Sequence, residues 1–122
     1  MRGLGRLFSR GPGRSGRSRG PVAQRSATSD DERHLREFAG SRTGVEAYVE
    51  PPTAVTTTTV VFVANTGEWT RRRVRDAHAA HSLANALGVP SYDAAVVGYP
   101  RRMREWNARR AAEEKARRTG SV

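Results

Sequence analysis

The pattern of apolar and polar residues is clearest in the middle of the chain, over residues 60–74. Five consecutive apolar residues, 60–64, lead into Asn65-Thr66-Gly67, and a second β-capable run follows. A β-branched run, a turn with Asn and Gly, and another such run together predict a β-hairpin. Because the first arm is apolar at every position, we expect both of its faces to be covered, as in a central strand.

The second arm of this hairpin alternates in character. Side chains in a strand point to opposite faces in turn, so one face of this arm carries Trp69, Arg71 and Arg73. An indole and two guanidinium groups would then stand side by side on a rigid support. This arrangement predicts a contact surface.

One strand and one helix are predicted before the hairpin. Ser29 with Glu32 three residues later forms a capping box, which indicates a helix that ends near Gly40. Residues 44–50 alternate as a half-buried strand does, with Tyr48 on the polar face. Pro51-Pro52 ends this strand, and the short connection indicates antiparallel pairing with the next one.

Two further helices are predicted after the hairpin. Apolar residues recur at helical spacing from Asp76, an N-cap, to the stop at Gly88. Residues 91–99 suit either a helical turn from Ser91 or a short strand at 95–97, and we expect a helical or irregular segment packed on the core. Pro100 opens a last helix. We expect this helix to dock onto the body through Met103 and Trp106, and beyond them it consists mainly of charged residues and alanine.

These elements predict an α+β fold: a three-stranded antiparallel sheet packed by two helices, plus a charged C-terminal helix. Residues 1–28 are rich in Arg, Gly and Ser and too poor in apolar residues to form a core, so they are expected to be a disordered arm. Residues 29–110 are expected to form a single small domain, and residues 111–122 a charged tail that frays.

Composition indicates the class of partner. The chain has 122 residues, a net charge of +10 and a pI near 11.5, with the positive charge concentrated at its two ends. Such a distribution suits polyanions such as nucleic acid or ribosomal RNA, or an anionic membrane surface. The chain contains 21 Arg and one Lys, so the codon bias of a GC-rich genome is an alternative explanation for part of the arginine excess.

Several other functions are not expected. There is no cysteine, and no apolar run approaches the ~18 residues that span a membrane. We therefore expect a cytoplasmic protein without stable membrane insertion. His78 and His81 lack a third ligand nearby, and no nucleotide-binding loop follows a strand. We expect no catalysis, no metal and no cofactor.

The leading prediction is a non-catalytic nucleic-acid-binding protein, with RNA or a ribonucleoprotein favoured. Guanidinium groups bind phosphate bidentately and stack on bases, and an indole adds a stacking surface. The predicted contact residues are Trp69, Arg71, Arg73, Arg75, Arg101, Arg102 and Arg104, with Arg14, Arg17 and Arg19 of the arm. Alternatively, the strand arginines protect a sheet edge from aggregation, and the protein binds an acidic protein through a sheet edge or the C-terminal helix.

Arg75-Asp76-Ala77-His78 opens the second predicted helix, after one helix and three strands. This order of elements resembles the topology of double-stranded-RNA-binding domains, in which that helix opens with a basic motif that grips phosphates. The present stretch departs from that motif. Residues 67–74 and 88–94 resemble segments of small uncharacterised actinobacterial proteins, a similarity that covers about residues 30–110 and implies no particular activity.

Overall fold

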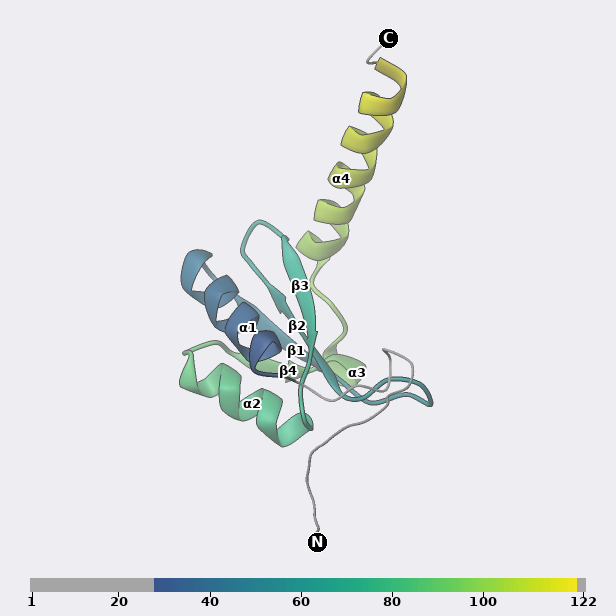
Figure 1. The fold of residues 1–122 in the computed structure, drawn as a ribbon. Helices are drawn as coiled ribbons and strands as arrows, with labels where there is room; N and C mark the ends of the chain where they lie inside the picture. The colour runs from purple at the N-terminus through teal and green to yellow at the C-terminus, as the bar shows by residue number, and fades with distance from the viewer. Residues whose placement is uncertain (1–27, 121–122) are drawn as a thin grey trace, which may run out of the picture.

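The computed structural model describes residues 28–120 and has an α+β fold, which confirms the predicted class (Figure 1). Most of the predicted arm, residues 1–27, lies outside the described residues. The elements in chain order are α1 (Ser29–Ser41), β1 (Glu46–Glu50), β2 (Thr59–Val63), β3 (Trp69–Arg73), α2 (Ala77–Ala86), β4 (Ser91–Asp93), α3 (Ala94–Val97) and α4 (Arg101–Gly120).

The sheet has four strands in the order β3-β2-β1-β4. β2 pairs antiparallel with β1 and β3, whereas β4 runs parallel to β1. The prediction of a three-stranded antiparallel sheet was therefore wrong in one strand. β4 has only three residues, and its pairing begins with the bond from the Ala47 amide to the Pro90 carbonyl, 2.8 Å. Such a strand is held by backbone pairing and carries no apolar alternation that a sequence could show.

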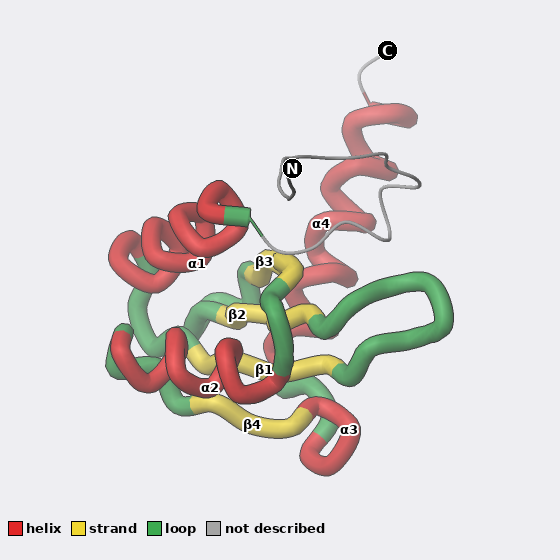
Figure 2. Tube along the Cα trace, turned by 60° about the horizontal axis from the view of Figure 1, so that its bottom comes forward, coloured by secondary structure: helices red, strands yellow, loops and turns green. Residues whose placement is uncertain are grey.

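One face of the sheet is covered by α1 and α2, which lie together on the same side (Figure 2). Ala47, Val49, Val60 and Phe62 point to this side because they alternate along their strands. The small residues of α2 allow its backbone to approach the strands closely. The buried helix residues that complete this core are Leu35, Phe38, Ala80 and Ala84.

The other face is covered by α3 and the first turns of α4. Val61 and Val63 of β2 pack there against Ala94 and Met103. Tyr48, expected on a polar face, is buried with 6% exposure, because the connection from β4 to α4 crosses this face. Both faces of β2 are thus covered, as the continuous apolar run predicted.

Two local predictions need correction. The N-cap of α1 is Thr28, one residue earlier than Ser29, and its hydroxyl accepts from the Asp31 amide at 3.2 Å. The capping box forms at this register because the Asp31 carboxylate accepts a hydrogen bond from the Thr28 amide at 3.0 Å. The same carboxylate also accepts from Arg72. Residues 91–99, for which a helical or irregular segment was expected, contain both a strand, β4, and the short helix α3 that follows it.

Helix α4 leaves the body and projects away from it (Figure 1). Met103 is its only buried residue and Trp106 is half-buried, so the predicted docking of these two side chains is confirmed. From Asn107 to Gly120 every side chain is exposed. Within residues 28–120, no helix has the length and apolar character needed to cross a membrane.

Candidate functional site

Trp69 lies at the foot of α4 and is half-buried. Its indole packs beside the cluster around Met103, and its Nε1 donates to Asn107 Oδ1 at 2.8 Å. The Arg71 guanidinium covers part of the ring, 5.2 Å from the centroid. The indole is therefore occupied by contacts within the protein. It does not offer the open stacking surface that the alternating pattern predicted.

Arg71 is paired within the sheet face. Its guanidinium donates two hydrogen bonds to Glu50, at 2.8 and 3.0 Å, and the same carboxylate accepts from the Thr59 and Tyr99 hydroxyls. Burial raises the pKa of Glu50, but the hydrogen bonds from Arg71, Thr59 and Tyr99 outweigh burial and hold this pKa below its ordinary value. The charge on Arg71 is thus neutralised by an ionised partner.

Arg102 forms a second internal pair at the root of α4. Its Nε donates to the Ala64 carbonyl at 2.9 Å, and its Nη2 donates to Glu46 at 2.8 Å. The bonds from Arg102 and from the Tyr48 hydroxyl lower the pKa of Glu46. Arg102 therefore fastens α4 to the sheet and does not face a ligand.

The remaining strand arginines gather at the edge formed by β3. Arg72 reaches Asp31 at 3.4 Å, while Arg73 has no carboxylate partner within ion-pair distance among residues 28–120. A hollow of about 250 Å³ lies here, lined by Asp31, Thr56, Thr59, Arg71, Arg72 and Arg73. The edge carries local positive charge, most of it offset by Asp31 and Glu50.

The other predicted contact residues do not extend this edge into one surface. Arg75 is exposed and lies 3.4 Å from Asp76. Arg101 and Arg104 are exposed at the start of α4, and Arg104 donates to the Tyr99 carbonyl at 3.3 Å. Arg14, Arg17 and Arg19 lie outside the described residues. The structure thus places the predicted residues at several separate locations and uses three of them, Trp69, Arg71 and Arg102, in contacts within the protein.

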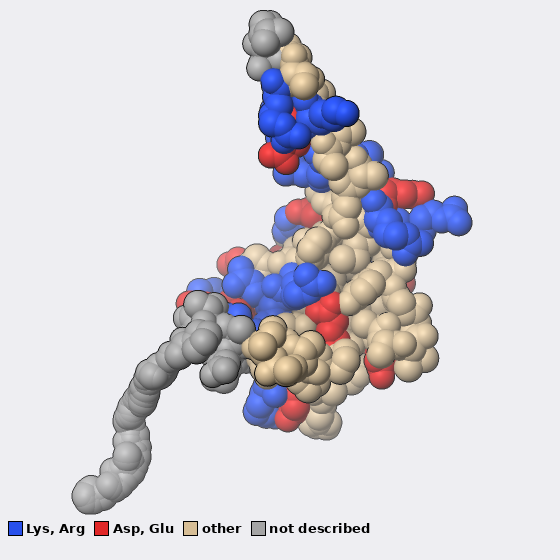
Figure 3. Space-filling view, turned by 90° about the vertical axis from the view of Figure 1, so that its right-hand side faces the viewer, with Lys and Arg blue, Asp and Glu red and all other residues tan. Residues whose placement is uncertain are grey.

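More basic side chains without a carboxylate partner lie along α4 than at the edge of β3 (Figure 3). In the part of the chain that the structure describes, Arg102 alone among the α4 cations pairs with a carboxylate. Glu105, Glu113 and Glu114 lie four residues before Arg109, Arg117 and Arg118, but none of these pairs lies within ion-pair distance in the described residues. The unpaired α4 cations beyond Arg101 and Arg104 are Arg109, Arg110, Lys115, Arg117 and Arg118.

The charge is therefore segregated. Residues 101–120 contain eight basic and three acidic residues, whereas residues 28–100 contain seven basic and nine acidic residues. Residues 1–27 contain seven Arg and no acid. The folded body is slightly acidic, and the surplus positive charge belongs to α4 and to the N-terminal residues.

A hollow lined by tyrosines lies where α3 meets α4. It has a volume of about 260 Å³ and is lined by Glu46, Tyr48, Tyr92, Val97, Gly98, Tyr99 and Pro100. The rings of Tyr92 and Tyr99 lie 5.5 and 6.0 Å from that of Tyr48. Sequence reasoning missed this hollow because Tyr48 is far from the other two tyrosines in the chain and meets them only through the pairing of β4 with β1.

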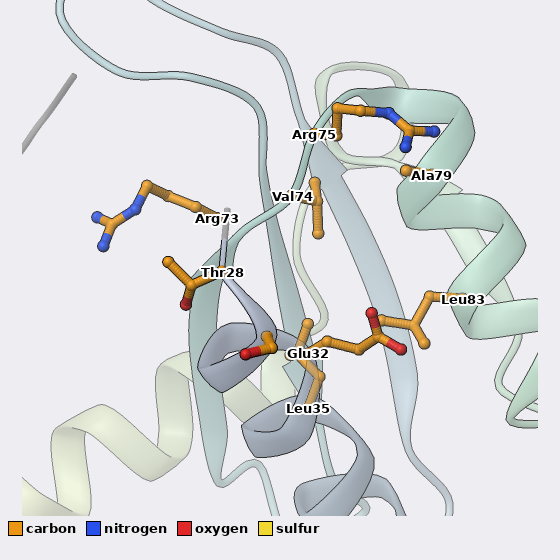
Figure 4. Close-up of a pocket in the computed structure, with 9 residues that line it drawn as sticks. Thr28, Glu32, Leu35, Arg73, Val74, Arg75, Ala79 and Leu83 are labelled. Carbon is orange, nitrogen blue, oxygen red and sulfur yellow. The ribbon is translucent and has the colours of Figure 1, made fainter. Parts of the chain in front are cut away.

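Another hollow, of about 490 Å³, lies between α1, α2 and the end of β3 (Figure 4). Leu35, Val74 and Leu83 line it, and the guanidinium groups of Arg73 and Arg75 lie on opposite sides (Figure 4). Its polar groups do not converge on one point. Among residues 28–120, no three His, Asp or Glu side chains come together as metal ligands would.

Comparison with known protein families, with curated proteins and with solved structures gave no match. We therefore infer function from the chain's own residues.

Proposed function

We propose that this protein binds nucleic acid without catalysing a reaction, with RNA as the favoured ligand. The observation that carries the proposal is α4, a helix about 30 Å long whose exposed cations have no carboxylate partners among the described residues. The arginines of residues 1–27 add a second cationic segment. Both segments extend a body that is itself slightly acidic.

Phosphate is the anion that best fits these groups. Guanidinium donates paired hydrogen bonds to phosphate, and a row of cations that follows a nucleic-acid backbone releases its condensed counterions. α4 has no apolar stripe beyond Trp106, so nothing on its outer part would hold it against a protein core. An elongated polyanion needs no such stripe.

An acidic protein is the alternative partner. The exposed length of α4 and the open edge of β4 support it, because both could accept a partner element. Treatment of a pull-down with nuclease separates the two proposals. Partners that survive nuclease and high salt would identify a protein partner and would exclude the nucleic-acid proposal.

The direct test is the affinity of the full chain for a labelled RNA across a salt series. Phosphate contacts predict that log affinity falls linearly with log salt concentration. Replacement of Arg110 and Arg117 by Gln should reduce this slope by roughly 1.5, because about one counterion is released per contact. Arg33→Gln with Arg36→Gln is the matched control, since it removes the same charge from α1, where both arginines are paired.

Equal effects of the two double variants would show that only net charge matters and that α4 is not the contact surface. Unchanged binding in both would exclude α4 altogether.

A further inference from the structure

We propose that the tyrosine hollow, defined by Glu46, Tyr48, Tyr92, Val97, Gly98, Tyr99 and Pro100, binds one unpaired nucleobase of an RNA strand whose phosphates contact α4. This inference rests on the proposed function and specifies it: the ligand has single-stranded character, and the stacking residue is Tyr92. Trp69, the stacking residue that the sequence predicted, does not take this role.

The aromatic surface is present and accessible. The Tyr92 side chain is 37% exposed and its ring lies 5.5 Å from Tyr48, tilted by 30°. Tyr48 is buried, and its ring packs against that of Tyr92 on the side of the core. A base entering the hollow would stack on a ring that is already held in place. Stacking of this kind tolerates any base, because every base has a π-face.

The hollow also holds an acceptor for base N–H groups. Glu46 lines it and is ionised at neutral pH, since the bonds from Arg102 and Tyr48 lower its pKa. Both of those bonds end on Oε1, and Oε2 has no hydrogen-bond partner among the described residues. Carboxylates accept hydrogen bonds from base amino groups. The hollow thus offers one stacking surface and one acceptor.

Cations stand where the phosphates of that strand would pass. Pro100 forms part of the hollow, and α4 begins at the next residue. Arg104 donates to the Tyr99 carbonyl, which places its guanidinium at the rim, and Arg101 is exposed beside it. A strand anchored by its base in the hollow would therefore continue onto the cations of α4.

Val96 and Val97, 77% and 55% exposed, extend the same surface. They provide apolar area against which a sugar or a neighbouring base can rest. A protein contact would use the valines but would leave the free Glu46 oxygen and the rim arginines without a matching role. Nucleic acid uses all of these groups.

The test compares two labelled RNAs with the full chain by fluorescence anisotropy: a single strand of mixed sequence, and the same strand annealed to its complement. Tyr92→Leu removes the ring and keeps an apolar side chain, whereas Tyr92→Phe keeps the ring. We expect Tyr92→Leu to weaken binding of the single strand about tenfold. Binding of the duplex, and binding by Tyr92→Phe, should not change.

Two outcomes would overturn this inference while leaving the proposed function intact: wild-type binding of the duplex alone, or single-strand affinity that Tyr92→Leu does not alter. Absence of binding to both RNAs would overturn both proposals. Self-association of the wild-type chain that Val96→Asp abolishes, together with an unaltered RNA affinity in Tyr92→Leu, would assign the surface to a protein contact.

Discussion

Gly67 shows how a single residue fixes the direction of α4. Its φ of 95° lies in the region that favours glycine, and an added Cβ would collide with the Arg102 carbonyl and lie 2.9 Å from the Trp106 Cβ. The hairpin turn therefore touches the root of the helix directly. Together with the Trp69–Asn107 and Arg102–Ala64 bonds, this contact determines where the helix leaves the body.

Gly67→Ala should destabilise the protein by about 3 kcal/mol or more, since backbone strain and overpacking act together. The matched control is Gly88→Ala, which has a similar φ of 71° but no atom within 4 Å of the added Cβ. It should cost about 1 kcal/mol, from strain alone. Urea unfolding of both variants measures the difference. Equal losses would mean that the turn does not support α4.

Glu50 is the residue at which stability should depend on pH. Its folded pKa lies below the ordinary value, so the stabilisation is fully present above the ordinary pKa and is lost as the pH falls through the lower, folded value. Glu50→Gln should destabilise the protein at neutral pH by about 1–3 kcal/mol, because it leaves Arg71 without its ionised partner. This difference between wild type and variant should shrink in acid.

Urea unfolding at neutral and at acid pH measures this effect. Glu37→Gln, at an exposed position of α1 with no ion pair to a described residue, is the control and should leave stability almost unchanged. A Glu50→Gln deficit that persists in acid would show that side-chain shape, and not charge, accounts for the loss.

At the scale of elements, the parts with strong local signals were predicted and the parts that depend on distant pairing were not. The hairpin has an apolar run and an Asn-Gly turn, and α2 has regular helical spacing from Asp76. β4 has neither signal, because it is only three residues long and pairs with β1, which lies more than 40 residues earlier in the chain. Its presence brings the connection to α4 across the sheet, and this is what buries Tyr48 and occupies Trp69.

For the candidate site too, local features could be predicted from the sequence and features that depend on distant pairing could not. The sequence alone shows that the surplus positive charge lies at the ends of the chain. Which arginines are free could not be read from the sequence, because Arg71 and Arg102 look like their neighbours until strand register places Glu50 and Glu46 beside them. The tyrosine hollow depends on β4 and was missed for that reason.

The outer part of α4 should be the least protected helix in the protein. Beyond Trp106 it has no tertiary contacts that bury side chains, and isolated helices of this length are marginal in water. Backbone amides of residues 111–120 should exchange with deuterium much faster than those of residues 80–87 in α2. Added RNA should slow exchange in α4 selectively. Protection of residues 111–120 as strong as that of α2 would contradict the exposed arrangement.

At the scale of the whole molecule, the proposed function and the segregation of charge together predict that RNA binding depends on both ends of the chain. The slightly acidic body between them should add little electrostatic attraction for a polyanion, whereas residues 1–27 and α4 are each strongly basic. Two cationic segments joined to one body hold a long ligand more tightly than either alone, because the second contact forms at high effective concentration. A short RNA that reaches only one segment should lose this advantage.

Replacement of Arg14, Arg17 and Arg19 by Gln in the full chain tests this dependence. Each lost phosphate contact should lower the salt slope by about 0.7 to 0.9, so the triple variant should lose roughly 2 units of slope on a long RNA. On a short RNA held by α4 alone its affinity should equal that of the wild type, because no arm contact exists there to lose. Anisotropy titrations with the two RNA lengths, each over a salt series, measure both slopes. The same slope in the variant and the wild type on the long RNA would show that the N-terminal arginines do not contact the ligand, and α4 alone would then account for binding.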